Sequence, residues 1–390
     1  MEKLKEENGV VLVVTMLLLL VFTLIGMSAV NTATYDNLIS GNKRISEQAF
    51  YLAEAGINEF LGRFREGATG ELKDNAPSNP HWKLFIASNA ELAEKIGYSS
   101  SDADHIFAQS LQNPLAYGVE IRHKADIANK VITKAGAPLY IATSYGYTQD
   151  GGKKVIEADF IGSPPFDPPA ALYTERPIDV HGTSTVIQGM DQCGATNKPG
   201  ILTTLLESTN PINISGNPTI QGNPDKKYNG DNLGLRAVVN YLKEDADANS
   251  TYDYNSNQTL TGYSDSWGTP TSTGTSTPIT YDGPMKIVYF NMHGDKTLKL
   301  AGQSHGAGLL LVDGNLDLNG GFTWYGVIIV TGALDFTGGG EKNVTGGILT
   351  GEAATVQVDL GGNAGILYCS QVADKLKKIV TPLRMTRWKD

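Results

Sequence analysis

The sequence predicts an α+β protein in which a long amino-terminal helix carries a small antiparallel sheet and then a larger β-rich domain. Three observations lead to this prediction: an apolar run over residues 10–30, alternating strand-like runs between residues 115 and 161, and imperfect repeats of short apolar strands after residue 170. The chain has 390 residues, which is too long for one typical domain and indicates two or more.

Residues 10–30 contain no charged residue and no proline. At about 1.5 Å per residue, a helix over this run spans roughly 31 Å, the thickness of the hydrocarbon core of a bilayer. A cleaved secretory signal would have a shorter apolar core. Here apolar residues continue at helical spacing as far as Phe64. One helix is therefore predicted over residues 10–66, with an apolar, membrane-spanning first half and an amphipathic second half.

Four segments of this region form a specific set: Asn8-Gly9-Val10-Val11-Leu12-Val13-Val14, the leucine run 17–20, residues 32–42 and residues 48–56. Together they resemble the PilX-type minor pilins of type IV pili. The resemblance implies that residues 1–9 are a prepilin leader, that a prepilin peptidase cuts after Gly9, and that Val10 becomes the new, usually methylated, amino terminus. It also implies a single-pass location in the inner membrane before assembly, an extracellular pilus afterwards, and other minor and major pilins as partners.

The sequence departs from the major pilins at Val14, the fifth residue after the predicted cut. Major pilins carry a glutamate there, which neutralises the amino terminus of a neighbouring subunit inside the apolar filament core. An unpaired ammonium group is costly in such a core. The tip-capping pseudopilin of type II secretion is similar in this respect. The hypothesis is a minor pilin at or near the pilus tip, where a large outer domain has room and a large tip adhesin could bind.

Residues 67–162 are predicted to form a pilin-like α+β head. Two short helices are predicted at 81–92 and 102–112. Three strands are predicted at 115–123, 138–148 and 153–161, with a hairpin turn at Gln149-Asp150-Gly151-Gly152. This small antiparallel sheet would pack on the second half of the long helix.

Residues 163–169 form the clearest domain boundary, with four prolines in seven positions that favour extended, semi-rigid chain. A β-rich domain is predicted over residues 170–370. Residues 371–390 form a basic tail, with six basic residues against two acidic ones. A solvated terminal helix is one interpretation of this tail, and a contact with acidic partners or lipid head groups is the other.

Repeats predict a parallel β-helix for the β-rich domain. Residues 178–182 align with 212–216 at a spacing of 34, and residues 308–320 align with 326–338 at a spacing of 18. Short apolar strands that end in glycine and recur about every 20 residues fit the coils of a solenoid; an irregular β-sandwich is the alternative. Residues 223–284 interrupt the pattern with a predicted helix over 233–245 and a long exposed loop over 249–284.

One motif in this interruption matches D-x-D-x-N-x-x-x-D. Calcium prefers several oxygen ligands around one centre, and alternate positions of a tight loop can supply them. Calcium is therefore an expected cofactor, although Ser250 and Ser256 stand where an EF-hand has glycine and glutamate. Solvated acidic side chains are the alternative interpretation. The candidate ligands are Asp245, Asp247, Asn249 and Asp253.

The only two cysteines are Cys193 and Cys369. If the outer domain is exported, a disulfide between them is chemically allowed. Their separation in the sequence says nothing about their distance in the fold, so two separate buried thiols remain the alternative.

Composition argues against nucleic acid as a partner, because the net charge is −10 and no basic, aromatic-rich patch occurs. The histidines lack zinc-site spacing, and no nucleophile elbow or phosphate-binding loop is present. The leading hypothesis is therefore a subunit that is not an enzyme. The alternatives are a membrane-anchored, carbohydrate-active β-helix enzyme and an anchored adhesin outside any filament. The enzyme would need clustered carboxylates such as Asp313, Asp317 and Asp335, but the last two occupy equivalent repeat positions.

Overall fold

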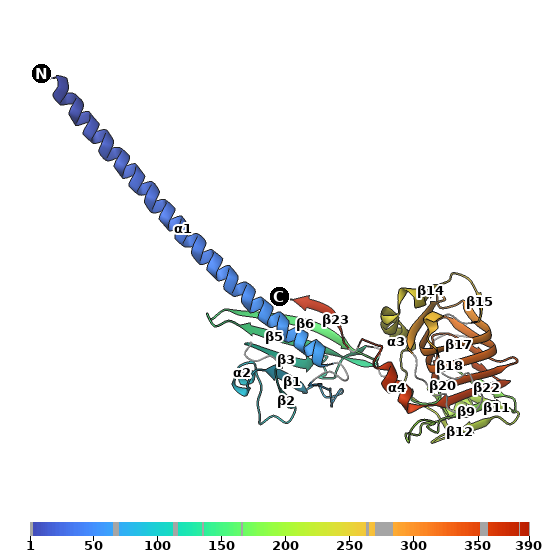
Figure 1. The fold of residues 1–390 in the computed structure, drawn as a ribbon. Helices are drawn as coiled ribbons and strands as arrows, with labels where there is room; N and C mark the ends of the chain where they lie inside the picture. The colour runs from blue at the N-terminus through green and yellow to red at the C-terminus, as the bar shows by residue number, and fades with distance from the viewer. Residues whose placement is uncertain are drawn as a thin grey trace.

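The computed structural model describes residues 3–64, 70–111, 116–134, 136–164, 167–262, 265–269, 284–351, 358–381 and 383–389. These residues form three parts: a long helix, a sheet that packs on its second half, and a β-helix. Figure 1 shows the helix leaving the head on the side away from the β-helix. The predicted α+β architecture is confirmed.

The long helix is α1 (Lys3–Arg63). Its first half stands clear of the rest of the molecule, and none of its most apolar 18-residue window is buried. Its second half is seated on the sheet by small and apolar side chains that recur every three or four residues. These are Ala49, Ala53, Ile57 and Phe60, all at most 1 % exposed. The predicted helix with an apolar first half and an amphipathic second half is confirmed, and it ends at Arg63.

The head sheet has the strand order β2-β1-β3-β5-β6-β23, and β4 adds to β5. All pairs are antiparallel except β1 with β2. The short helix α2 (Ala90–Lys95) lies beside β1. The strands are β1 (Lys83–Ala87), β2 (His105–Gln109), β3 (Tyr117–His123), β4 (Thr133–Lys134), β5 (Ala137–Tyr147), β6 (Lys153–Gly162) and β23 (Leu383–Lys389).

The three strands predicted between residues 115 and 161 are confirmed as β3, β5 and β6. The two predicted helices are wrong for most of their length, because residues 83–87 and 105–109 are paired parallel strands. Among the described residues of this region, only Ala90–Lys95 is helical. The first of these strands is buried at four successive positions, and so short an apolar run has no period that separates helix from strand.

Of the two interpretations of the basic tail, the terminal helix is confirmed for residues 371–376, which lie in α4 (Ser370–Leu376), and is wrong for residues 383–389, which form β23 at the edge of the head sheet. Leu383 lies opposite Gly162 at the end of β6. Arg387 donates to Glu157 at 2.9 Å and to Asp159 at 3.1 Å, so its charge pairs with carboxylates of this chain. The β-rich domain is therefore an insertion between two neighbouring strands of the head.

An ionic cluster in the head holds the segment around residue 74 against the sheet. Asp74 accepts hydrogen bonds from His123 Nε2 at 2.7 Å and from the Tyr140 hydroxyl at 2.8 Å. The His123 Nδ1 donates to the carbonyl of Asn79 at 2.6 Å, and its ring stacks on Trp82. Burial alone would raise the pKa of Asp74, but these hydrogen bonds and one from the backbone lower it.

The inserted domain is a parallel β-helix, as predicted, since every strand pair described in it is parallel. Its strands are β7 (Leu172–Thr174), β8 (Ile178–His181), β9 (Val186–Gln188), β10 (Ile201–Thr203), β11 (Ile212–Ser215), β12 (Thr219–Gln221), β13 (Lys226–Lys227), β14 (Thr251–Asp253), β15 (Gln258–Thr261), β16 (Lys286–Asn291), β17 (Thr297–Asp313), β18 (Asn315–Val330), β19 (Leu334–Phe336), β20 (Glu341–Thr350), β21 (Val358–Leu360) and β22 (Asn363–Tyr368).

The registers of these strands follow the sequence repeats. Gly308 lies opposite Gly326, which confirms the spacing of 18. Ile178 lies opposite Ile212, which confirms the spacing of 34. Aliphatic residues in equivalent positions thus stack along the inside of the solenoid, where they form one continuous apolar core.

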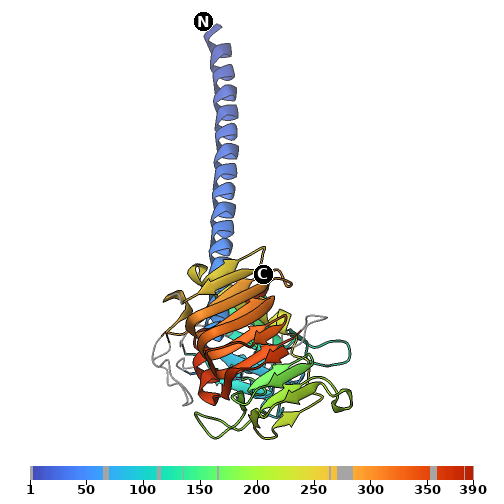
Figure 2. The ribbon, with the colours of Figure 1, turned by 90° about the vertical axis from the view of Figure 1, so that its right-hand side faces the viewer.

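The coils do not stack in the order of the sequence. The first coil, β7–β8–β9, is covered on one side by the coil β10–β11–β12. Its other side is covered by β20–β21–β22, which arrives from the end of the domain. We call β20–β21–β22 the closing coil. Figure 2 shows these red strands beside the green strands of the first coils. The strands β14 and β15 lie at the opposite end of the stack.

The segment between the two halves of the β-helix contains α3 (Leu235–Leu242), which confirms most of the predicted helix, followed by the short 3-10 helices η2 (Lys243–Asp245) and η3 (Ala248–Ser250). The predicted long loop is wrong at β14 and β15. Residues 263–264 and 270–283 of that loop lie outside the described residues. The remaining short helices are η1 (Glu207–Thr209), η4 (Asp265–Trp267) and α4 (Ser370–Leu376).

Candidate functional sites: the exposed helix and the root of the insertion

Residues 10–35 of α1 present an uncharged, largely apolar surface. No residue from Val10 to Tyr35 is charged. Among the described residues, one helix has the length and the apolar composition needed to cross a membrane, and that helix is α1. Val14 is half exposed, so its side chain faces whatever surrounds the helix.

The threonine hydroxyl groups on this surface are satisfied within the helix. Thr15 donates to the carbonyl of Leu12 at 2.9 Å, Thr23 donates to Leu20 at 2.8 Å, and Thr32 donates to Ser28 at 3.0 Å. A threonine that bonds back to its own helix leaves no unpaired donor for an apolar surrounding to desolvate. This half of the helix is therefore suited to lipid or to the core of a filament.

The end of α1 is fixed to the head by a buried ion pair. Arg63 binds Glu59 at 2.8 Å, and both side chains are at most 8 % exposed. Arg63 also donates to the carbonyls of Gly70 and Gln109, each at 2.8 Å. The Tyr117 hydroxyl donates to Glu59, and burial together with this carboxylate raises the pKa of Tyr117. These bonds give the exposed half of the helix a rigid base.

The helix approaches β5 so closely that one position there requires glycine. A Cβ atom on Gly146 would lie 2.0 Å from the carbonyl oxygen of Ala49 and 2.6 Å from the backbone nitrogen of Ala53. Both neighbours are backbone atoms and cannot swing aside. Small residues on both elements therefore set the distance between helix and sheet.

Asp245, a predicted calcium ligand, fastens the exit from the β-helix. Its carboxylate accepts hydrogen bonds from the Thr381 backbone at 3.0 Å and from the Thr381 hydroxyl at 2.7 Å. It also lies 2.7 Å from the guanidinium of Arg384 in β23. That guanidinium stacks over the ring of Tyr241 in α3, 4.3 Å from its centre. These contacts hold α3 against residues 377–381, which lead from α4 back to the head and which we call the exit linker.

The other predicted calcium ligands turn to different partners. Asp247 pairs with Lys286 at 3.1 Å, and Asp253 pairs with His293 at 2.7 Å. Asn249 lies in η3. Among the described residues, no group of three or more histidine, cysteine, aspartate or glutamate side chains could hold a metal ion. The D-x-D-x-N-x-x-x-D pattern thus does not bring its four residues to one centre here.

The structure joins Cys193 and Cys369 by a disulfide, with their Cα atoms 5.1 Å apart, and so chooses between the two alternatives that the sequence left open. Cys193 follows β9 of the first coil, and Cys369 follows β22 of the closing coil. Asp191 supports the junction, since it accepts hydrogen bonds from the backbone N–H groups of Cys193 and Ser370. Burial opposes this charge, but these hydrogen bonds lower the pKa of Asp191.

The entry to the insertion is fastened beside its exit. Asp167 in the proline-rich linker pairs with Lys198 at 2.7 Å and accepts a hydrogen bond from the Tyr368 hydroxyl at 2.7 Å. Tyr368 is the last residue of the closing coil. The linker that enters the domain and the coil that leaves it are thus tied together at one place.

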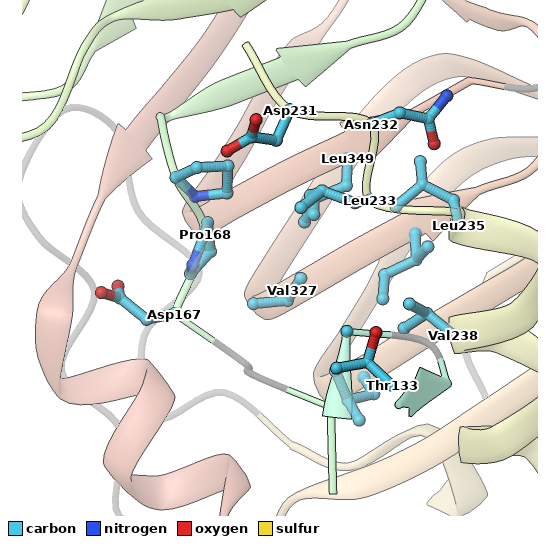
Figure 3. A pocket seen from close by; sticks show the side chains of 14 residues that line it. Thr133, Asp167, Pro168, Asp231, Asn232, Leu233, Leu235, Val238, Val327 and Leu349 are labelled. Atoms are coloured by element: carbon cyan, nitrogen blue, oxygen red, sulfur yellow. The ribbon is translucent and has the colours of Figure 1, made fainter. Parts of the chain in front are cut away.

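A cavity of about 480 Å³ lies between the head and the β-helix. Figure 3 shows Leu233, Val327 and Leu349 around it, with Asp231 and Thr133 on its borders. Aliphatic residues of β17, β18, β20 and the α3 region form half of the lining, and polar side chains occur at the edge. This composition is typical of sites for small apolar ligands, and no sequence motif predicted it. The full lining is Thr133, Gly136, Asp167, Pro168, Pro169, Asp231, Asn232, Leu233, Leu235, Val238, Leu309, Val327, Ile329 and Leu349.

The carboxylates weighed for an enzyme are each bound to another group. Asp313 accepts from Arg236 at 3.0 Å and from Thr331 at 2.9 Å, and Asp317 pairs with Lys299 at 2.9 Å. Asp317 and Asp335 lie opposite each other on adjacent strands, which confirms their equivalence in the repeat. Asp359 and Asp179 continue the same column. Burial raises the pKa of Asp359, and the neighbouring carboxylates add to this rise.

Comparison with known proteins bears on the exposed helix. The PilX N-terminal family matches residues 8–58, which lie entirely within α1. Residues 8–58 are thus similar to the amino-terminal region of PilX-type pilins. The match stops before the head sheet, so the head and the inserted β-helix lie outside it.

No curated protein sequence matches the chain. Among solved structures, the crystal structure of the competence-associated pilin ComZ from Thermus thermophilus is similar over 88 % of this chain and 97 % of that chain, with 13 % identity and a TM-score of 0.24. A TM-score this low does not establish a shared fold.

Proposed function

We propose that this protein is a minor pilin that is incorporated at or near the tip of a type IV pilus, where it begins the filament and presents its β-helix to partners. The observation that carries the proposal is the exposed, uncharged run of α1 over residues 10–35, which overlaps the match to the PilX N-terminal family and has Val14 in place of a carboxylate. Its role requires no catalytic chemistry.

Electrostatics supports the position in the filament. Cleavage after Gly9 would create an ammonium group on Val10. A carboxylate 4 Å away stabilises such a group by about 4 kcal/mol at an effective dielectric constant of 20. Val14 cannot supply this stabilisation to a neighbouring subunit. The subunit is therefore placed best where no neighbour's amino terminus has to be neutralised, and the first position of a filament meets that condition.

The arrangement of the domains supports the same position. The β-helix is attached to the head on the side opposite the exposed half of α1 (Figure 1). In the proposed assembly, α1 spans the inner membrane, is cut by the prepilin peptidase, and then packs against the helices of other minor and major pilins. The β-helix would project beyond the last subunit, where it is free to bind a tip adhesin or an external surface.

The test is the intact mass and amino-terminal sequence of the protein from its native membrane, with and without the prepilin peptidase. A start at Val10 that depends on the peptidase is the expected result, together with gold-labelled antibody at filament ends. A start at Met1 in both strains would contradict the proposal and leave the anchored adhesin or enzyme. Label along the whole shaft would contradict the tip position alone.

A further inference from the structure

The β-helix ends in a coil that is only begun. β13 pairs with the outer side of β10 and so starts a new coil beyond β10–β11–β12. The chain then leaves toward α3. Among the described residues, no strand pairs with the outer edge of β11 or β12. One strand of this coil is therefore present, and two strand positions beside it are open.

Backbone groups on these two edges point outward. On the inner side, Ile178 donates to the carbonyl of Pro211 at 2.8 Å, and Thr219 donates to the carbonyl of Thr185 at 2.8 Å. In a parallel sheet, successive residues of a strand direct their N–H and C=O groups to opposite sides. The intervening residues Ile212, Ile214 and Ile220 therefore present their backbone groups to the open side.

The same residues leave the apolar core uncovered. Ile214 is 39 % exposed, whereas Val180, which stacks on it in the next coil, is fully buried. Ile212 and Ile220 are half-buried, whereas their counterparts Ile178 and Ile187 are fully buried. Another coil on this side would cover these three isoleucines in the same way that β11 and β12 cover Ile178, Val180 and Ile187.

The strands β11 and β12 themselves contain no residue that blocks pairing, although Pro211 and Pro218 directly precede them. Exposed edge strands are usually blunted by charged residues or proline. β13 carries Lys226 and Lys227, but β11 and β12 carry neither a charge nor a proline. The two open strand positions thus lie beside the edges of these two strands.

The β-helix already contains one example of a distant segment that binds a coil by parallel strand pairing. The closing coil comes from more than 150 residues away in the sequence and docks on the first coil by three parallel strand pairs. β11 and β12 repeat the sequence of β8 and β9, namely Ile-x-Val/Ile-x-Gly followed by Ile-Gln-Gly. A segment of similar pattern from elsewhere can add to their outer edges in the same way.

We propose that the outer edges of β11 and β12 bind extended segments of another polypeptide, which add two parallel strands and complete the coil begun by β13. The partner is expected to offer two short uncharged strands with aliphatic residues at alternate positions and a glycine-containing turn between them. A different protein fits better than a second copy, because one copy occupies the proposed tip. The inference rests on the proposed function for this choice of partner only.

The test uses the full chain in detergent and a fluorescent synthetic peptide with the sequence of residues 211–222, which already pairs with β8 and β9 in the required register. Fluorescence anisotropy is expected to show saturable binding. Ile214→Lys places a charge in the uncovered core and should weaken binding at least tenfold. The matched control Asn213→Lys lies on the same strand with its side chain on the opposite face, and it should change binding less than twofold.

A second variant keeps the side chain apolar. Ile214→Pro removes an outward N–H group from an edge where proline is tolerated, and it should also weaken binding tenfold. Hydrogen exchange then tests whether the peptide binds by strand pairing: amides in residues 210–222 should exchange more slowly when the peptide is bound. Without peptide, the variants should show wild-type exchange outside residues 210–222, which confirms that they are folded. Absence of saturable binding, equal loss in the variants and the control, or unchanged exchange would overturn the proposal. So would dimers that Ile214→Lys dissociates, since they would make a second copy the partner. None of these results depends on processing at Gly9, which tests the proposed function separately.

Discussion

The disulfide between Cys193 and Cys369 should make a large contribution to the stability of the β-helix. It links residues 176 positions apart. In the chain-entropy relation, closing a loop of that length in the unfolded state is worth about 5 kcal/mol at 25 °C, and measured disulfides typically reach about 2–4 kcal/mol. The closing coil also ends at this bond, so its loss lets β22 separate from β9 more easily. Reduction is therefore expected to destabilise the domain by about 3 kcal/mol.

Urea unfolding of the full chain in detergent would measure this effect through tryptophan fluorescence, because Trp267 and Trp324 are both buried in the β-helix core. The reduced wild type should unfold at lower urea than the oxidised wild type. The variant with both cysteines changed to alanine should match the reduced protein and show no response to reductant. Coincident transitions for the oxidised and reduced wild type would refute the reasoning.

Three further predictions concern the head and its attachment. Gly146→Ala would force α1 away from β5 and should lower the free energy of unfolding by about 3 kcal/mol, which would appear as faster hydrogen exchange in residues 49–60. At Gly62 an added Cβ meets no atom within 4 Å, so the control Gly62→Ala should not speed this exchange. Asp245→Asn leaves the guanidinium of Arg384 without its carboxylate and should lower the free energy of unfolding by about 3 kcal/mol. Trypsin should then cleave the exit linker at least five times faster, and an unchanged rate would contradict the role of Asp245 in holding that linker. Because the pKa of Asp74 is lowered in the folded head, its stabilising effect should be complete well above pH 3.8 and disappear as the pH falls below 3.8. Asp74→Asn should remove that part of the pH dependence of urea stability, and a parallel profile for both proteins would contradict it.

Hydropathy, alternation and repeats in the sequence were enough to predict the long helix, the main strands of the head and the β-helix. Residues 10–35 of α1 are uncharged and free of proline, so the sequence alone predicts an apolar helix there. β5 alternates in the sequence because one face packs on α1. The β-helix repeats appear in the sequence because equivalent residues of adjacent coils stack on one another, as Gly308 does on Gly326.

Contacts between residues that lie far apart along the chain left no local pattern in the sequence. Asp245 resembles a metal ligand beside Asp247, but its carboxylate binds Thr381 and Arg384, more than 130 residues further on. Residues 383–389 have no strong strand pattern, and their pairing with β6 across more than 200 residues makes them a strand. The cavity beside Leu349 joins two domains and has no local signature.

The insertion point explains why the coils are out of order. β6 and β23 are paired neighbours in the head, and such strands lie about 4.8 Å apart. The inserted domain must therefore begin and end at nearly the same place. A solenoid that adds coils in sequence order ends far from where it begins. This domain avoids that outcome because its last coil returns to dock on its first.

The disulfide, Asp167 and Asp245 all lie where this return has to be held, between the first coil, the closing coil and the two linkers. Because the closing coil takes one side of the first coil, the coil β10–β11–β12 has to lie at the outside of the stack. The coil β10–β11–β12 lies at an end of the stack, and β13 is the only strand beyond it among the described residues. An insertion that is closed at its root is thereby left open at its outer end, and we infer that its partner binds there.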